Sequence, residues 1–279
     1  MKKWLQAGLA MTIAAWGTAH AAALDDAKAG WAAFQRGADN EAMQLLTQAI
    51  DAHQLDPRTT AVVFAYRGDV RMSDGVADQA LQDFNAAIEL DPRFVTGLTE
   101  RANAFRVLGQ FDRALDDFNT ALTVQPDFAP AYRGRGAIEY YQGQYQLALT
   151  DFQQALTLQA SYTYAAIWLH MAHAKLGQSD EKELAKNAVA IDRQAWPGPV
   201  LSLFLGDIQE NDLRSAATHG SPRDQRAQAC QATFYIAEFE LIRKNAGAAT
   251  QLFRDATSAC PPDLYEYTGA RAEMNSMGE

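Results

Sequence analysis

The chain has 279 residues, of which 48% are hydrophobic and 21% are charged, and it carries a formal net charge of −10 at pH 7. This composition is typical of a soluble globular protein, and the length allows one or two domains. The acidic balance argues against nucleic acid and against anionic membranes as the main partners.

The N-terminal residues follow the order of a secretory signal peptide. Two lysines precede a mostly apolar run at residues 4–16, and the small residues Ala19 and Ala21 come after it. We therefore predict a signal peptide over residues 1–21, cleaved after Ala21 or shortly beyond, and a periplasmic mature chain without stable membrane insertion. An uncleaved membrane anchor is the alternative, although the run is shorter than the ~20 residues that span a bilayer.

A motif with a period of 34 residues runs through the middle of the chain. Each copy has a glycine, followed by an alanine, a phenylalanine and a second alanine at the spacing of one helix face. The glycine suits the left-handed turn that ends a first helix, and a proline stops the second helix in two copies. Such hairpins are expected to stack, because none buries its apolar face alone. The three copies are Gly75, Ala80, Phe84 and Ala87; Gly109, Ala114, Phe118 and Ala121; and Gly143, Ala148, Phe152 and Ala155.

This period and these residues resemble the tetratricopeptide repeat, or TPR. The resemblance predicts an all-α fold, a TPR solenoid of stacked antiparallel helical hairpins with a C-terminal helical cap. The array is expected to span residues 22–196, with a looser first repeat and a fifth repeat that keeps Gly177 but loses the signature of the second helix. The predicted repeats lie at about 24–56, 61–94, 95–128, 129–162 and 163–196.

The repeat pattern breaks after residue 196 and then returns. Prolines and glycines interrupt residues 197–226, which we predict to be a helical linker. Ala249, Phe253 and Ala256 restore the alanine–phenylalanine–alanine spacing, so residues 227–279 are predicted to form a TPR-like hairpin followed by a capping helix.

Two charged positions keep the same 34-residue step. The arginine lies midway along each predicted first helix and the aspartate midway along each second helix, so antiparallel packing can bring them together. We interpret them as a ladder of half-exposed ion pairs, each worth about 0–1 kcal/mol, that fixes the register of the array. The alternative is a row of arginines that catches an acidic ligand, which requires the aspartates to lie elsewhere. The residues concerned are Arg67, Arg101 and Arg135 with Asp83, Asp117 and Asp151.

The chain has two cysteines, Cys230 and Cys260. They begin the first helix and end the second helix of the C-terminal hairpin, and antiparallel packing places those two ends side by side. In an oxidising compartment we predict a disulfide, which closes a loop of about 30 residues and adds roughly 3–4 kcal/mol of stability. Two separate buried thiols are the alternative. No cysteine closely follows the predicted signal peptide, so we expect no lipid anchor.

Catalytic chemistry finds no support in the sequence. The chain contains no G-x-S-x-G elbow, no H-E-x-x-H helix and no glycine loop that cradles phosphate. His170 and His173 share a helix face, but no acidic or cysteine ligand stands at metal-binding spacing near them, which favours packing or surface roles. We therefore predict no catalytic residue, no metal and no cofactor.

A binding surface is the function that a repeat array favours. In stacked hairpins the first helices line an inner, concave face, whose variable side chains select a protein or peptide ligand. Arginines there can meet a carboxylate and tyrosines offer rigid amphipathic surface, while packing between helices is the alternative role for part of the set. The residues predicted to bind are Asp69, Asn103, Arg106, Arg133, Tyr140, Tyr164 and Met171.

The C-terminal half carries a second, finer resemblance. Its segments WLHMAHAKLG, AWPGPVLSLFLG, CQATFYIAEFELI and YEYTGARAEM are similar to the periplasmic NlpI-like TPR adaptor lipoproteins, although the chain lacks their lipid-bearing cysteine. This resemblance implies an all-helical adaptor that brings a tail-specific protease and peptidoglycan hydrolases together in the bacterial envelope. It implies partners among envelope proteins or peptides and leaves a homodimer open. The competing hypothesis is a structural subunit of an envelope complex, whose array mediates self-assembly.

Overall fold

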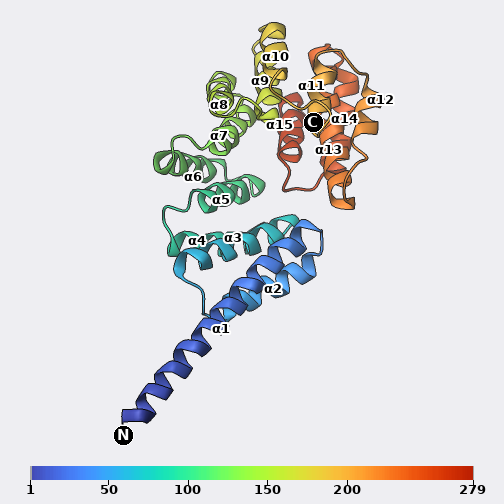
Figure 1. Ribbon diagram of the computed structural model, residues 1–279. Helices are drawn as coiled ribbons and strands as arrows, with labels where there is room; N and C mark the ends of the chain where they lie inside the picture. The colour runs from blue at the N-terminus through green and yellow to red at the C-terminus, as the bar shows by residue number, and fades with distance from the viewer. Residues whose placement is uncertain (1, 279) are drawn as a thin grey trace. The chain divides into compact units, whose positions relative to one another are not determined.

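The computed structural model describes residues 2–278, with side chains from residue 19 onward (Figure 1). Within these residues the backbone forms fifteen helices and no strand, which confirms the predicted all-α fold. The helices in chain order are α1 (Lys2–Gln35), α2 (Asp39–Asp51), α3 (Pro57–Ser73), α4 (Ala77–Leu90), α5 (Val95–Val107), α6 (Phe111–Val124), α7 (Ala129–Tyr141), α8 (Tyr145–Leu158), α9 (Thr163–Lys175), α10 (Glu181–Ala188), α11 (Gly198–Phe204), α12 (Glu210–Ala216), α13 (Pro222–Ile242), α14 (Ala246–Ala259) and α15 (Tyr265–Met277).

The helices belong to two compact units, residues 1–101 and residues 102–279, which we call unit 1 and unit 2. Unit 1 holds α1 to α4 and the beginning of α5, and unit 2 holds the end of α5 and helices α6 to α15. This division falls inside the repeat array. The predicted boundaries at residues 21, 196 and 226 mark changes in sequence pattern and stay predictions.

Helix α1 starts at Lys2 and continues without a break to Gln35. The predicted signal peptide, residues 1–21, lies almost entirely outside the residues whose side chains are described, so its cleavage stays a prediction. In the described part of the chain, no helix combines the length and the apolar character that crossing a bilayer requires.

Each hairpin of the central array turns at a glycine with a positive φ angle. The φ angle is 77° at Gly75, 71° at Gly109, 73° at Gly143 and 68° at Gly177. A residue without a Cβ atom takes this left-handed conformation without strain, so the first helix ends and the second begins within a few residues. The turns predicted from the glycine period are therefore confirmed.

The repeated phenylalanines fill the space between the helices. Phe84, Phe118 and Phe152 are fully buried. A methyl group added at Gly68 would lie 2.5 Å from the Phe84 ring, and one added at Gly134 would lie 2.4 Å from the Phe118 ring. Phe84 thus packs on the first helix of its own hairpin, and Phe118 contacts the first helix of the next hairpin. Small residues allow this close approach, as the repeat pattern predicted.

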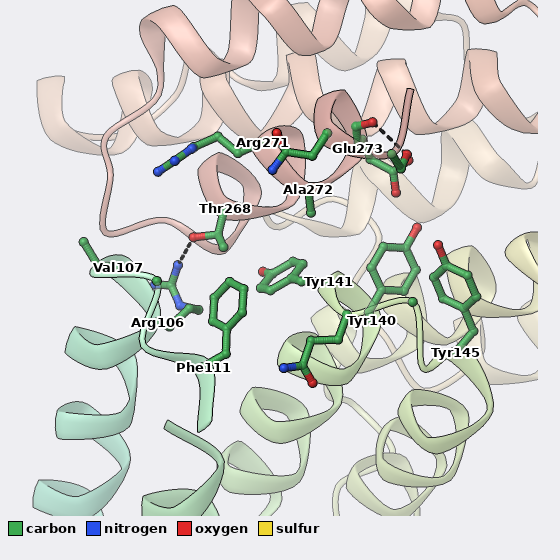
Figure 2. A pocket seen from close by; sticks show the side chains of 15 residues that line it. Arg106, Val107, Phe111, Tyr140, Tyr141, Tyr145, Thr268, Arg271, Ala272 and Glu273 are labelled. Atoms are coloured by element: carbon green, nitrogen blue, oxygen red, sulfur yellow. Dashed lines mark hydrogen bonds between the residues drawn. The ribbon is translucent and has the colours of Figure 1, made fainter. Parts of the chain in front are cut away.

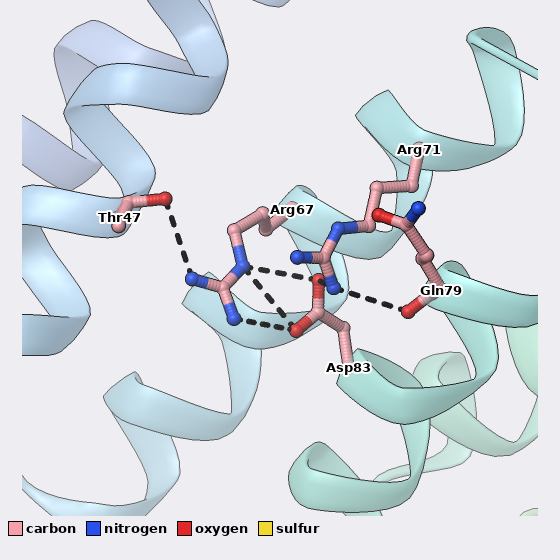
Figure 3. Close-up of polar contacts among 5 residues, drawn as sticks. All are labelled: Thr47, Arg67, Arg71, Gln79 and Asp83. Atoms are coloured by element: carbon pink, nitrogen blue, oxygen red, sulfur yellow. Dashed lines mark hydrogen bonds and ion pairs between the residues drawn. The ribbon is translucent and has the colours of Figure 1, made fainter. Parts of the chain in front are cut away.

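The predicted ladder of ion pairs has a rung in unit 1, between α3 and α4. Arg67 donates from Nη2 to Oδ1 of Asp83 over 2.7 Å and from Nε to Oδ2 over 3.0 Å (Figure 3). Arg71 lies 2.7 Å from the same carboxylate, and Arg67 also donates to the hydroxyl of Thr47 on α2. Only 3% of the Asp83 side chain is exposed, so this pair is more buried than the half-exposed pair that we expected.

A similar rung lies in unit 2, between α7 and α8. Arg135 donates to Asp151 over 2.6 Å from Nε and 2.7 Å from Nη2, and its Nη1 donates to Asn119 on α6 over 2.7 Å. Each arginine therefore ties the second helix of its own hairpin to the second helix of the preceding hairpin. Since the aspartates occupy both guanidinium groups, the alternative of an arginine row open to an acidic ligand does not hold for these two rungs.

The C-terminal hairpin consists of α13 and α14, and α15 follows it. A disulfide joins Cys230 on α13 to Cys260 at the end of α14, with 5.0 Å between the Cα atoms. The predicted disulfide is confirmed, and the alternative of two separate thiols is wrong. The bridge spans 30 residues of sequence, for which the chain-entropy model gives a gain of roughly 3–4 kcal/mol in the free energy of unfolding.

An aromatic cluster around Trp168 joins the repeats of unit 2 to the C-terminal hairpin. The indole is fully buried, and the ring centroids of Tyr140, Tyr141 and Phe234 lie 5.3, 5.7 and 5.8 Å from it. Trp168 belongs to α9, the two tyrosines belong to α7 and Phe234 belongs to α13. The repeats and the C-terminal hairpin of unit 2 therefore share one continuous core.

Two residues of α8 test the packing role of the phenylalanines. We expect Phe152→Ala to lower the free energy of unfolding by about 3–5 kcal/mol, because it leaves a cavity beside Gly136 on α7. Leu147→Ala should change it by less than about 0.5 kcal/mol, since 53% of Leu147 is exposed. Urea unfolding followed by circular dichroism measures both values, and similar losses in the two variants would contradict the role given to Phe152.

Candidate functional site

Six of the seven residues predicted to bind a ligand lie in unit 2, on the first helices of its hairpins. Helices α13 and α15 of the same chain pack against the face that these residues form. The seventh residue, Asp69, lies on α3 in unit 1. The six are Asn103 and Arg106 on α5, Arg133 and Tyr140 on α7, and Tyr164 and Met171 on α9.

Arg106 holds the segment that leads into α15. Its Nη1 donates to the Leu264 carbonyl over 3.1 Å and to the Thr268 hydroxyl over 2.7 Å (Figure 2). Its Nη2 donates to the Asp263 carbonyl. A single guanidinium therefore fixes two successive main-chain carbonyls and the first turn of the helix that follows them.

Tyr265, the first residue of α15, is the anchor of this segment. The Cζ atoms of Arg106 and Arg133 lie 4.0 and 3.5 Å from its ring centroid, and its hydroxyl hydrogen-bonds to Oδ1 of Asn103. Its carbonyl accepts a hydrogen bond of 2.9 Å from the hydroxyl of Tyr141. The repeats thus recognise the ring, the hydroxyl and the carbonyl of one residue, and cation–π contacts of this kind contribute up to about 2 kcal/mol each when desolvated.

Arg133 keeps its charge in the interior of unit 2. Burial opposes the charged form, but Tyr265, Tyr162 and Glu266 outweigh this effect and raise the pKa of the guanidinium. The Nε atoms of Arg133 and Arg106 find no hydrogen-bond acceptor among the described residues. The docked segment therefore satisfies most, but not all, of the donors on this face.

Tyr164 joins the face to α13 through a network of hydrogen bonds. Its hydroxyl accepts from Nε2 of Gln231 over 3.1 Å, and the same amide group donates to Oε2 of Glu266 over 3.2 Å. Gln231 accepts in turn from the indole of Trp196 over 2.6 Å, and Tyr235 donates to Oε1 of Glu266 over 2.5 Å. Both oxygens of the buried Glu266 carboxylate are thereby satisfied, as burial of a charge requires.

Two buried carboxyl groups lie at the other end of the face. Nζ of Lys175 lies 2.6 Å from Oε2 of Glu273 and 3.6 Å from Oε2 of Glu238, and the Tyr140 hydroxyl hydrogen-bonds to Glu238. Burial and the charge of Glu273 raise the pKa of Glu238 to about 8, although Lys175 acts in the opposite direction. Lys175 therefore forms an ion pair with Glu273, and the raised pKa of Glu238 favours its protonated form near neutral pH.

Three of the residues predicted to bind a ligand are buried in this structure. Arg106, Tyr140 and Met171 expose only 1%, 2% and 0% of their surface, so an external partner reaches them only if the C-terminal helices move. Packing between helices, the alternative considered for part of the set, is their role in this structure. The other three residues on this face are half-buried and contact the same C-terminal segments. Binding of an external ligand by this set stays a prediction.

A cavity of about 480 Å³ remains beside the docked helix, where the ends of α5 and α7 meet α15. Figure 2 shows Arg106 and Arg271 on one side of it and Glu273 and Tyr145 on the other, with the Phe111 ring between them. The buried charges of its wall already bond within the chain. The cavity is therefore part of the interface between α15 and the ends of α5 and α7.

Asp69 has a different environment, in unit 1. It is mostly buried and forms no hydrogen bond or ion pair with the described residues, and burial and then the charge of Glu100 on α5 raise its pKa well above the ordinary value. Tyr66, three residues earlier on α3, stacks on Trp31 of α1 with 4.2 Å between the ring centroids. All four side chains keep some exposed surface. We call Trp31, Tyr66, Asp69 and Glu100 the acidic inner face of unit 1.

The described residues contain no cluster of side chains suited to hold a metal ion, and His170 and His173 bond to neighbouring side chains. No group of three or more histidine, cysteine, aspartate or glutamate side chains there is placed to hold a metal ion. Nδ1 of His170 lies 2.8 Å from Asp180, and Nδ1 of His173 lies 2.8 Å from Oε1 of Gln178. Both rings thus contact the turn between α9 and α10.

Sequence reasoning missed the residues that fill the inner face of unit 2. Tyr265, Glu266 and Thr268 belong to a segment that the sequence predicted only to be a capping helix. Their polar character favours exposure, and only their buried partners on α5 and α13 explain why they are covered. The one signal available was the mixture of acidic and aromatic residues in DLYEYT, which is unusual for a cap that faces water.

Comparison with known proteins agrees with the geometry of the hairpins. The family model for the tetratricopeptide repeat matches residues 66–125 and 99–166. Three solved structures share the fold at low sequence identity. A tetratricopeptide repeat protein from Parabacteroides merdae is 18% identical, with a TM-score of 0.54 and coverage of 92% of this chain and 99% of that chain. PilF of Pseudomonas aeruginosa is 15% identical, with a TM-score of 0.54 and the same coverage of 92% and 99%. A thermophilic TPR protein of Thermus thermophilus is 21% identical, with a TM-score of 0.55 and coverage of 67% and 98%.

The anchoring role of Tyr265 can be tested by separating its ring from its hydroxyl. Tyr265→Phe should lower the free energy of unfolding by about 1 kcal/mol, because it loses only the hydrogen bond to Asn103. Tyr265→Ala should lower it by about 3–5 kcal/mol, because both guanidinium groups lose their aromatic contact and a cavity is left. Urea unfolding of the full chain measures both, and an alanine variant as stable as the phenylalanine variant would rule out the ring as the anchor.

The raised pKa of Glu238 predicts a dependence of stability on pH. The folded chain holds this proton up to about pH 8, whereas an unfolded glutamate releases it near its ordinary value, so stability falls as pH rises between these two values. We expect Glu238→Gln to reduce the loss of unfolding free energy between about pH 6 and about pH 8 by about 2 kcal/mol. Glu181→Gln, at an exposed site on α10, is the control and should keep the wild-type loss. A wild-type loss in both variants in urea titrations would show that Glu238 is not the group responsible.

Proposed function

Because the chain is a tetratricopeptide repeat protein, we propose that it is a non-catalytic scaffold of the periplasm that binds other proteins of the bacterial cell envelope. Arrays of stacked hairpins offer extended inner surfaces to proteins and peptides. The proposal places partner binding on the inner faces of the hairpins and assigns no chemical step to the chain.

The docked segment at residues 263–265 is the observation that carries this proposal. Side chains of α5 and α7 bind its three successive carbonyls, and two arginines contact the ring of Tyr265. Contacts with main-chain carbonyls and one aromatic anchor are the means by which a surface holds a peptide of another protein. The first helices of this chain thus have side chains suited to that task, and in unit 2 the ligand is the chain itself.

Two observations support export to the periplasm. Cys230 and Cys260 form a disulfide, and structural disulfides persist in oxidising compartments. The N-terminal sequence has the order of a signal peptide. We propose that the mature protein is free in the periplasm and carries no lipid.

The resemblance of the C-terminal segments to NlpI-like adaptors supports a finer proposal about the partners. By this resemblance we propose a tail-specific protease and peptidoglycan hydrolases, held close to one another by the scaffold. A homodimer is compatible with this arrangement, because the two inner faces of a pair offer more surface than one.

Site-specific photo-crosslinking in intact bacterial cells tests the scaffold proposal. A photoreactive phenylalanine, p-benzoylphenylalanine, replaces Tyr66 on the inner face of unit 1 in one variant and the exposed Leu147 of α8 in the other. We expect position 66 to give a crosslinked envelope protein, identified by mass spectrometry, and position 147 to give little product.

Each other outcome of the crosslinking has a definite meaning. Crosslinks that join only two copies of this chain would replace the scaffold by the self-assembling subunit. No crosslink at either position, or equal yields at both, would overturn the proposal that the inner face binds partners.

A further inference from the structure

We propose that α15 is an internal stand-in for a partner, and that a segment of another protein displaces it from the inner face of unit 2, which carries Asn103, Arg106 and Arg133. The matching segment offers main-chain carbonyls, then an aromatic residue at the start of a helix, and a glycine four residues later. This inference rests on the proposed scaffold function and adds the place and the sequence character of the partner.

The first step of the argument is the kind of contact that holds α15. Arg106 and Tyr141 donate hydrogen bonds to the carbonyls of three successive residues, 263–265. Every polypeptide carries such carbonyls, so these bonds do not require this particular segment. The ring of Tyr265 lies against two guanidinium groups and its hydroxyl bonds to Asn103, so a tyrosine is the side chain that these contacts favour.

The second step is that α15 fits this face incompletely. The Nε atoms of Arg106 and Arg133 are buried and find no acceptor within the part of the chain that the structure describes. A buried donor without an acceptor costs free energy. The cavity of about 480 Å³ also stays open between α15 and the ends of α5 and α7 (Figure 2). A segment that brings an acceptor to these donors, or a larger side chain to the cavity, gains contacts that α15 does not make.

The third step is that α15 contributes little to the apolar core. Its buried residues are two glutamates, a threonine, a glycine and an alanine, whereas its larger side chains Tyr267, Met274 and Met277 are only half-buried. Helix α13, by contrast, buries Phe234 and Ile236. Elements with few buried apolar side chains open most easily while the rest of a fold stays intact. Within unit 2, α15 is therefore suited to leave its place.

The fourth step is the link between α14 and α15. Cys260 is bridged to Cys230 on α13, and Pro261 and Pro262 come next, before the docked segment. The disulfide closes the hairpin of α13 and α14, so the hairpin keeps its form when α15 leaves. The two prolines have no N–H group, so no helix runs across the link. Release of α15 is thereby confined to the residues after the disulfide.

Gly269 adds a requirement for the helix of the partner. A Cβ added there would lie 2.9 Å from the ring of Phe234 on α13. Gly269 follows Tyr265 by four residues, so both lie on one side of α15. A partner helix therefore fits with an aromatic residue in its first turn and a glycine one turn later. The tethered α15 has the advantage of a high local concentration, so the partner needs the additional contacts that α15 leaves unmade.

Binding of a peptide with the sequence of residues 261–277 to the full chain tests this inference. The probe carries fluorescein and is followed by fluorescence anisotropy. In the chain, Gly269→Leu removes the internal competitor, because the added side chain meets the ring of Phe234, whereas the repeats stay unchanged. This variant should bind the probe at least about tenfold more tightly than the wild type. Gly247→Leu is the control, since Gly247 on α14 is exposed with open space around it, and should stay within about twofold of the wild type.

A second probe tests the selectivity of the face. A peptide of the same sequence with Tyr265→Ala should bind the Gly269→Leu chain at least about tenfold more weakly than the first probe. Equal binding of the two peptides would overturn the inference. A Gly269→Leu chain that is folded by circular dichroism and binds no more tightly than the wild type would also overturn it.

Hydrogen exchange of the wild-type chain decides the question without any variant. The chain is labelled with heavy nitrogen, so that mass spectrometry separates its fragments from the identical sequence of the probe. Added probe should speed amide exchange in residues 265–277, because α15 leaves its place. Unchanged exchange there at about 1 mM probe, the local concentration that a short tether provides, would contradict displacement.

The crosslinking experiment separates this inference from the scaffold proposal, because Tyr66 lies in unit 1. Capture of an envelope protein at position 66, together with failure of the peptide tests, leaves the scaffold standing and rejects a displaceable α15. Success of the peptide tests without capture at either crosslinking position rejects the scaffold, although α15 is displaceable. A wild-type dimer that the probe converts to monomer in sedimentation velocity identifies the occupant as α15 of a second copy, and a partner from another protein is then wrong.

Discussion

The inner face of unit 2 contains the buried Arg106 and the half-buried Arg133, and the structure of that unit depends on how their charge is accommodated. A buried guanidinium without a partner is costly, since water no longer solvates it. Here the partners are main-chain carbonyls, one threonine hydroxyl and the ring of Tyr265. These groups all belong to the segment that begins α15, so the docking of α15 in this position accommodates the charge of both arginines.

The remaining features of unit 2 support that position. The disulfide closes the hairpin of α13 and α14 just before residue 261, from which the chain continues to the docked segment. Trp168 packs between the tyrosines of α7 and Phe234 of α13, which joins the repeats to the same hairpin. Lys175 neutralises part of the acidic charge that α13 and α15 bring with them. Apolar packing, a covalent bridge and paired charges thus act on one interface.

The two units put equivalent repeat positions to different uses. Asn103 in unit 2 binds a side chain of the same polypeptide, whereas Asp69 at the equivalent position of unit 1 has a raised pKa and no bonded partner among the described residues. The hairpins themselves are alike, because the glycine turns, the buried phenylalanines and the arginine–aspartate rungs recur in both units. The scaffold is therefore constant, and substitution at a few inner positions changes what each part of the array can hold.

The sequence by itself determined the hairpins, because their signals are local or strictly periodic. Gly75 and its repeats specify the left-handed turns, Phe84 and its repeats fill a space left by small residues, and Arg67 meets Asp83 since antiparallel helices bring their midpoints together. The pairing of Cys230 with Cys260 followed from the same antiparallel geometry.

Only the tertiary structure decided what covers the inner face. Arg106 and Tyr265 are separated by more than 150 residues, and their contact depends on the path of α10 to α12, where the repeat pattern of the sequence is interrupted. The same is true of the raised pKa of Glu238, since it results from burial and from the charge of Glu273 on another helix, with Lys175 acting in the opposite direction. Local periodicity predicts how neighbouring helices pair, whereas burial of polar groups depends on long-range partners that a single sequence does not specify.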